Sequence, residues 1–193
     1  MRCHALSASL LLIAALGLNA DERGEWTMGP GESADTVTFS VHYTRDANHD
    51  NSSSSAWRKE NFVGLDFTGN TKRNVHFSIK RDAGTLDCEG LFEATEGAGL
   101  FTFHPHPEYA RQMAAMGFED MSDDSLLAAA LHDVSLSFAR AMRAKNIEGL
   151  KAHELIALRV HGVTPDYVQR LQAHGLPTLT ARQIIRLRNQ GID

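Results

Sequence analysis

Apolar and polar residues alternate along the first part of this chain. That period of two is typical of β-strands with one buried face. The alternating runs are Val37, Phe39, Val41 and Tyr43; Val75, Phe77 and Ile79; Leu86 and Cys88, in a return strand that can extend to Leu91; and Leu100 to Phe103. Gly84 sits in a turn between two runs, and short connections favour hairpins over parallel crossovers. The pattern predicts a β-rich domain over residues 21–104, with an antiparallel sheet of four or five strands.

The segment from Arg45 to Ser55 interrupts this pattern. It is polar throughout and ends in four consecutive serines, Ser52 to Ser55. A segment with so little apolar surface to bury is typical of a connection exposed to solvent. We therefore expect a mobile loop here.

From residue 105 the alternation gives way to helical spacing of the apolar residues. Here a 29-residue unit occurs three times in succession, without a gap. The copies are Pro105–Asp133, Val134–Gly162 and Val163–Gly191. In the third copy, Thr164 and Thr180 are typical helix N-caps, and Gly175 is a typical helix end. Residues 105–193 thus predict three 29-residue two-helix repeats that share a core. The predicted fold class is α+β: a small antiparallel β-sheet followed by a three-repeat α-helical array of six short helices.

Residues 1–20 have the pattern of a signal peptide. A short polar start precedes an Ala/Leu-rich run from Leu6 to Leu18, which ends in small residues. The run is short for a membrane span, and no second apolar run follows, so we expect no stable membrane insertion. The predicted location is periplasmic or secreted. Cys88 would be the one cysteine left after cleavage, so we expect no internal disulfide.

The charge of the chain is mildly acidic and unevenly distributed. Without residues 1–20, 18 basic and 24 acidic residues remain, a net charge of −6. This balance disfavours nucleic acid as a partner. The first copy carries −5, whereas the second and third carry +3 each. We expect the basic end to bind an acidic protein or to associate with another copy. The candidate partner-binding residues are Arg159, Arg182, Arg186 and Arg188.

Arg159 and Arg188 occupy equivalent places in their copies, and a second role is open to both. Arginine near a helix C-terminus interacts favourably with the last carbonyl groups. Either side chain could therefore serve the fold instead of a partner.

Chemical motifs in the sequence are incomplete. His104 and His106 form a His-x-His pair, which can bind a metal in extended structure. His153 and Glu154 begin a zinc-protease motif, but position 157 is alanine. No set of residues meets the requirements of an active site, so we assign no catalytic residue and no cofactor.

The segment from Leu155 to Val168 resembles tandem helical repeats in extracytoplasmic regions of bacterial bla-regulator-type sensor metallopeptidases and in small secreted companions. Arg81 to Thr85 and Gly97 to Phe103 resemble the β segment that precedes such repeats in uncharacterised exported proteins. This chain lacks the zinc motif and membrane helices of those peptidases, so the resemblance implies a recognition module and not a peptidase.

The predicted function is an exported non-catalytic protein-recognition or scaffold module, linked to envelope sensing. Two alternatives remain open. The first is a metal-binding protein or hydrolase that uses His104 and His106, with His132 or Asp133. The second is a structural envelope component that assembles with itself.

Overall fold

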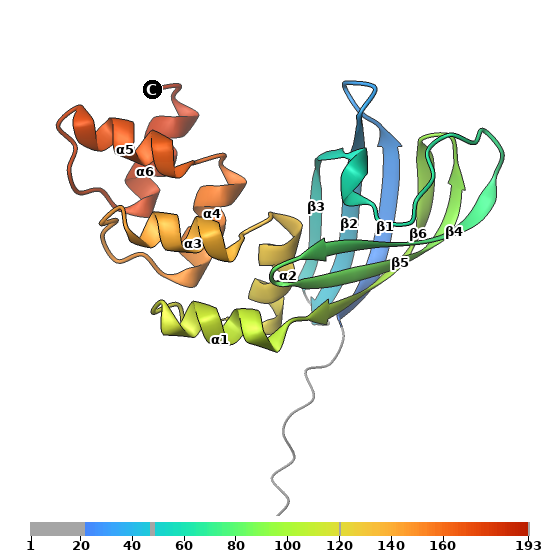
Figure 1. Cartoon of the computed structure of the whole chain (residues 1–193), viewed down its shortest axis with the longest axis horizontal. Coiled ribbons are helices and arrows are strands. Elements are labelled where there is room, and N and C mark those ends of the chain that lie inside the picture. The colour runs from blue at the N-terminus through green and yellow to red at the C-terminus, as the bar shows by residue number, and fades with distance from the viewer. Residues whose placement is uncertain (1–21, 47–48, 120, 193) are drawn as a thin grey trace, which may run out of the picture.

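A computed structural model describes residues 22–46, 49–119 and 121–192, and it contains a β-sheet followed by six α-helices (Figure 1). The predicted signal peptide lies outside the described residues. The strands are β1 (Glu22–Pro30), β2 (Thr36–Asp46), β3 (His49–Arg58), β4 (Arg73–Arg81), β5 (Gly84–Glu93) and β6 (Glu96–Pro105), with a 3-10 turn η1 (Lys59–Asn61) after β3. The helices are α1 (Pro107–Ala115), α2 (Asp123–Leu131), α3 (Leu136–Arg143), α4 (Ala152–Val160), α5 (Pro165–Ala173) and α6 (Ala181–Asn189). The predicted α+β class is confirmed.

The strands form one antiparallel sheet in the order β3-β2-β1-β6-β5-β4. β2, β4, β5 and β6 fall on the alternating runs of the sequence, so those four strands are confirmed. The sheet has six strands where four or five were expected, because β1 and β3 also join it. β1 pairs with β2 on one side and β6 on the other, which brings the two ends of the β half together.

The expected mobile loop over Arg45 to Ser55 is wrong for the residues that the structure describes. Residues from Asn51 onward belong to β3, and the serines pair residue by residue with β2, for example Ser54 with Ser40. Serine is not one of the residues that are enriched in strands. The neighbouring strand decides the conformation here, because β2 offers a long unpaired edge.

One face of the sheet forms an aromatic core. Trp26, Phe39 and Phe77 lie on this inner face and are almost fully buried. Phe62, from the connection after η1, closes the face, and its ring centroid lies 5.2 Å from that of Phe39. Edge-on contacts of this kind add to the free energy gained by burial.

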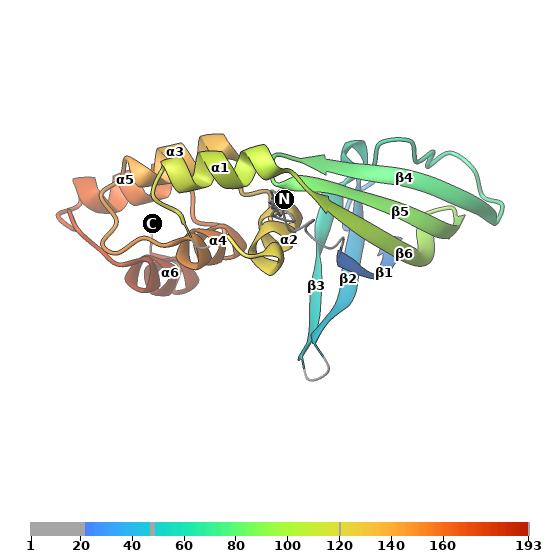
Figure 2. The ribbon, with the colours of Figure 1, turned by 90° about the horizontal axis from the view of Figure 1, so that it is seen from below.

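α5 and α6 begin directly after their predicted N-caps, Thr164 and Thr180. The side chains of Ser122, Thr164 and Thr180 accept hydrogen bonds at the starts of α2, α5 and α6. α1, α3 and α5 lie along one side of the helical half and α2, α4 and α6 along the other (Figure 2). No helix among the described residues has the length and apolar character that a membrane crossing requires.

The predicted three-repeat array is wrong as stated, because the helices do not clearly form three equivalent units. α2 packs against β5 and β6, whereas α4 packs mainly between α2 and α6. α1 and α5 begin with proline, but α3 begins with Leu136, whose N–H donates to the carboxylate of Asp82 in the turn between β4 and β5. The 29-residue period repeats the residues that start, end and bury each helix. It does not fix how the first two helices pack, because α2 contacts the sheet.

Candidate functional site

The face of the sheet opposite the aromatic core is exposed, and we call it the open face. Its side chains come from the strand positions that alternate with the buried ones. Arg23, Glu25, His42, His76, Glu89, Leu91 and Leu100 are exposed there, and Asp87, Thr102 and His104 are partly exposed. The sheet thus presents a broad surface of mixed chemistry.

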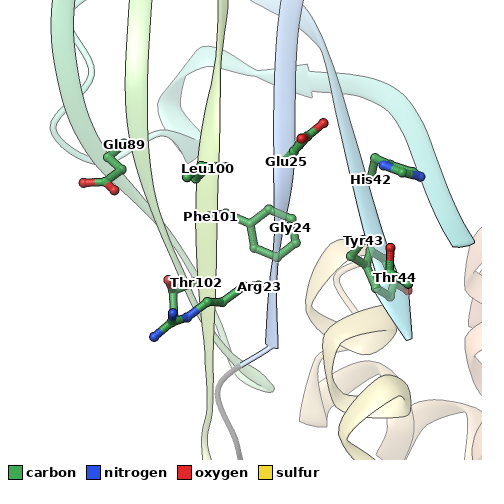
Figure 3. A pocket seen from close by; sticks show the side chains of 10 residues that line it. All are labelled: Arg23, Gly24, Glu25, His42, Tyr43, Thr44, Glu89, Leu100, Phe101 and Thr102. Atoms are coloured by element: carbon green, nitrogen blue, oxygen red, sulfur yellow. The ribbon is translucent and has the colours of Figure 1, made fainter. Parts of the chain in front are cut away.

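A single row of side chains crosses five strands of the open face. The register places His42 opposite Glu25, Glu25 opposite Leu100, Leu100 opposite Glu89, and Glu89 opposite His76. Figure 3 shows Glu25, Leu100 and Glu89 on their neighbouring strands. A carboxylate therefore lies on each side of a central leucine, and a histidine lies beyond each carboxylate.

Leu100 belongs to a small apolar patch on the open face. Leu91 pairs with Ala98, which places Leu91 diagonally next to Leu100 across β5 and β6. The exposed fraction is 56% for Leu100 and 45% for Leu91, among the largest for hydrophobic residues of the described chain. The patch, defined as Leu91, Ala98 and Leu100, is bordered by Glu89.

Three open depressions adjoin this patch. One of about 620 Å³ lies between Arg23, His42, Thr44 and Leu100 (Figure 3). Two others, of about 520 and 340 Å³, lie towards His76 and His104 and also include Leu100 and Glu89. Because all three depressions are lined by Leu100 and Glu89, they adjoin one another across the sheet.

Two side chains near the patch, His104 and Cys88, could take part in chemistry, and their contacts decide whether they can. His104 Nε2 lies 3.4 Å from Asp87 Oδ2. Cys88 points to the inner face and is fully buried, and this burial, with a smaller effect of Asp87, raises the pKa of the thiol. A thiol held neutral is a poor nucleophile, so Cys88 belongs to the core and not to the site.

The two histidines that the sequence suggested as metal ligands have different neighbours in the structure. His104 faces Asp87, whereas His106 occupies the N-cap of α1. The ring nitrogens of His106 lie 3.2 Å from the Asp82 carbonyl oxygen and 3.3 Å from the Thr85 hydroxyl. Among the described residues there is no group of three or more His, Cys, Asp or Glu side chains that could hold a metal ion.

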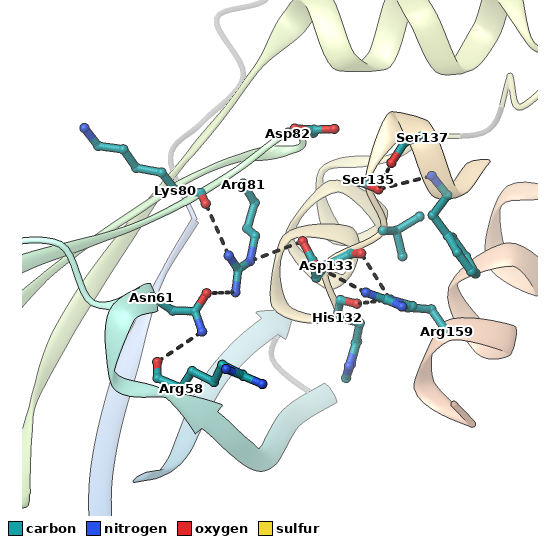
Figure 4. Close-up of polar contacts among 12 residues, drawn as sticks. Arg58, Asn61, Lys80, Arg81, Asp82, His132, Asp133, Ser135, Ser137 and Arg159 are labelled. Carbon is teal, nitrogen blue, oxygen red and sulfur yellow. Dashed lines mark hydrogen bonds and ion pairs between the residues drawn. The ribbon is translucent and has the colours of Figure 1, made fainter. Parts of the chain in front are cut away.

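Arg159, a predicted partner-binding residue, lies in a joint between the sheet and the helices (Figure 4). Its Nη2 donates to Asp133 Oδ2 at 3.0 Å, and its Nε donates to the carbonyl oxygens of His132 and Asp133. Its guanidinium also lies over the ring of Phe138. These contacts match the alternative role at a helix C-terminus, because the two carbonyls follow directly after α2.

The other side of this joint is Arg81, at the tip of the β4–β5 hairpin. Its Nε lies 3.5 Å from Asp133 Oδ1, and its Nη2 donates to Asn61 Oδ1 at 3.0 Å. Burial lowers the pKa of Arg81, and the negative charge of Asp133 opposes that shift. His132 and Asp133, suggested for a hydrolase, thus lie at a structural contact, and burial lowers the pKa of His132.

The three arginines of α6 differ in their surroundings. Arg188 is partly buried and stacks over the ring of Tyr167 at 5.2 Å. Arg182 and Arg186 are exposed and lie four residues apart, which places them on one helix face. Arg159 lies on α4 in the joint, so the four predicted arginines are not one uniform surface.

The open face was not predicted as a site. The sequence counted Leu100 in one apolar run with Phe101 and Phe103, and the structure places it on the opposite, exposed face. The sequence also cannot show the strand order, which places residues 25, 89 and 100 side by side.

Comparisons of this chain with protein-family models, with curated proteins and with solved structures find no match. The resemblance to the repeats of sensor metallopeptidases therefore stays a prediction.

Proposed function

We propose that this chain is an exported, non-catalytic protein-recognition module that binds its partner through the open face of the sheet. The observation that carries the proposal is the apolar patch around Leu100, exposed in the middle of the sheet and bordered by charged side chains. An apolar centre within a polar rim is typical of protein interfaces. The pattern of residues 1–20 supports export.

The shape of the open face suits a protein ligand better than a small molecule. Small ligands are usually held in enclosed, mainly apolar cavities. The three depressions here are open and extend over five strands. A partner that fits them would place an apolar side chain against Leu100 and basic groups against Glu25 and Glu89.

The helical half contributes a second contact in this proposal. Arg182 and Arg186 form an exposed cationic pair on α6, which suits acidic groups of the same partner. Arg159 is less suited to this role, because its guanidinium is already bound to Asp133.

Site-specific photo-crosslinking in cells tests the proposal. A crosslinking amino acid at Thr27, which is exposed on β1, should yield a discrete adduct with one protein, identified by mass. Leu100→Asp should reduce the adduct by about tenfold, since a few residues near the centre of an interface carry most of the binding free energy and the new carboxylate would be buried without a partner. Arg182→Glu with Arg186→Glu should reduce it less.

Two controls separate recognition from loss of fold. Val160→Asp changes an apolar residue of comparable exposure, 50%, on α4, and should leave the adduct unchanged. Lys72→Glu with Lys151→Glu makes the same change of charge as the arginine pair. An adduct that survives Leu100→Asp in full, or no adduct at any exposed position of β1, would contradict the proposal.

A further inference from the structure

α5 and α6 form the end of the helical half that lies farthest from the sheet (Figures 1 and 2). On their inner side, α5 packs against α3 and α6 packs against α4. On their outer side, no other element of the described chain lies beyond them (Figure 1). We call this outer side, with its apolar residues Leu176, Leu187 and Ile192, the end face.

Apolar residues of the end face are exposed at places where the earlier helices are covered. Leu187 is partly exposed, whereas Leu158, 29 residues earlier, is fully buried on α4, which has α2 on one side and α6 on the other. Ile192 is 45% exposed, whereas Val163, 29 residues earlier, is fully buried. The end face thus has apolar positions like those that further helices cover elsewhere in this chain.

The backbone around Ile192 shows that this comparison is one of equivalent places. The Tyr167 hydroxyl donates to the Ile192 carbonyl oxygen at 2.6 Å, as the Tyr109 hydroxyl donates to the Val134 carbonyl oxygen at 2.8 Å. Val134 is nevertheless buried. Ile192 is therefore exposed because it has no neighbour on its outer side within the described chain, and not because its backbone has moved away.

The end of α5 lacks a contact that the end of α1 has. Arg143 donates to the Met116 carbonyl oxygen after α1, and its guanidinium lies over the ring of Phe118 at 4.6 Å. The residues at these two places after α5 are His174 and Leu176. No hydrogen bond from the described residues reaches the carbonyl oxygen of His174, and Leu176 is 38% exposed where Phe118 is buried. A donor and an apolar surface from outside would complete this end.

We propose that the end face binds an amphipathic helix of a partner protein, with apolar residues along one side and carboxylates next to them. A helix suits this place because helices cover the equivalent sides of α3 and α4. Docking the apolar side of a helix against an apolar surface is a common mode of recognition. The inference deepens the proposed function, because it names the chemistry that the cationic helix α6 would recognise.

The charge of the end face selects an acidic partner. Arg186 is exposed on α6 at the place that Ala128 holds on α2 and Ala157 holds on α4. The third copy of the 29-residue unit carries four arginines and one acidic residue, Asp166. Carboxylates on a docked helix would pair with this positive charge, and charge complementarity of this kind sets the choice of partner.

A second copy of this chain does not have the chemistry that the end face requires. If α1 of another copy docked there, Ala114 would stand at the place from which Arg143 and Gln172 donate to the carbonyl oxygens at the end of the preceding helix. The donor would then be missing. If two end faces met each other, two surfaces of the same positive sign would be brought together, which is unfavourable. The acidic helix therefore belongs to another protein.

Fluorescence anisotropy with a labelled synthetic peptide tests this inference. The peptide is about 20 residues long, enough to form a helix, with leucines along one side and glutamates on the other. The native protein should bind it saturably, and less tightly at higher salt. Ile192→Asp and Arg186→Glu should each weaken binding by about tenfold. Both residues are exposed, so the circular dichroism spectrum should not change. Arg186→Glu should also bind a peptide with lysines in place of the glutamates more tightly than the native protein does.

The controls separate this surface from the open face and from simple charge attraction. Leu100→Asp makes the same change as Ile192→Asp at a residue of comparable exposure, 56%, and should bind the peptide normally. Arg58→Glu is the control for Arg186→Glu, since Arg58 is exposed on β3. Because Leu100→Asp acts on the open face alone, failure there and failure at the end face are measured separately. A scrambled peptide of the same composition should bind about tenfold more weakly. Absence of saturable binding, or equal affinities of the native protein and both end-face variants, would overturn the proposal.

Discussion

At the scale of single residues, Asp133 shows how one side chain connects the two halves of the molecule. It follows α2 in a left-handed conformation, with φ of 52°, and its two carboxylate oxygens face Arg81 and Arg159. The side chain of Arg81 is only 17% exposed. This guanidinium is largely but not fully shielded from water, so it depends in part on its partner, because a charge that loses both water and partner is costly.

Asp133→Asn should therefore destabilise the protein. Asparagine tolerates the same backbone conformation, so the change removes the charge and little else. We expect the free energy of unfolding to fall by about 1–2 kcal/mol, measured by denaturant unfolding. Glu108→Gln is the matched control, because Glu108 and Arg111 form a pair in which both side chains are largely exposed. It should cost less than about 0.5 kcal/mol. Equal effects of the two substitutions would show that the joint has no special role.

The residue scale also shows where sequence reasoning stops. The sequence assigned Arg159 to a partner or to helix-end carbonyls, and the structure places it at the end of α2, 26 and 27 residues away. Local patterns indicate that an arginine suits a helix end. They do not indicate which helix end, because that depends on how the helices pack.

At the scale of elements, two glycines determine how closely β5 and β6 pack beneath Trp26. Gly90 and Gly99 face each other across the two strands. A Cβ on Gly99 would lie 1.9 Å from the Glu89 carbonyl oxygen, and one on Gly90 would lie 2.8 Å from the Trp26 ring. The indole N–H of Trp26 donates to the same Glu89 carbonyl at 3.1 Å. The inner face therefore has no room for a side chain at either glycine.

Gly99→Ala should consequently destabilise the sheet. The new methyl group has to move backbone atoms, and overpacking of this kind costs about 3 kcal/mol. Gly29→Ala on β1 is the control, since no atom of the described residues lies within 4 Å of the position that its methyl group would take. It should change the free energy of unfolding by less than about 0.5 kcal/mol. Thermal or denaturant unfolding of both variants measures the difference, and similar losses would argue against steric conflict at Gly99.

Elements with a strong local pattern were predicted well from the sequence. Alternation located β2, β4, β5 and β6, and the capping residues Thr164 and Thr180 located the starts of α5 and α6. β3 was missed, because a run of serines has no apolar period and becomes a strand only beside β2. The three-repeat array failed for a related reason. The sequence repeats the residues that start and bury each helix, but it does not repeat what the helices pack against. α2 packs against β5 and β6, whereas α4 packs against other helices.

At the scale of the whole molecule, the sheet and the helices share one hydrophobic cluster. It runs from Trp26 and Phe39 in the sheet, through Tyr109 and Leu127, to Ile184 in α6. The joint at Asp133 and the bond from Leu136 N–H to Asp82 add polar contacts between the halves. Elements that share a core lose each other's contacts when either one unfolds, so we expect the two halves to unfold together.

This cooperativity can be measured because each half has its own signal. Both tryptophans, Trp26 and Trp57, lie in the sheet, so their fluorescence reports on the β half. Helical circular dichroism reports mainly on the segment from Pro107 to Asn189. With increasing denaturant the two signals should change at the same midpoint, because coincident transitions are the mark of one cooperative unit. Two separate midpoints would mean that contacts within each half exceed those between them, and that the helices can remain folded after the sheet has lost its aromatic core.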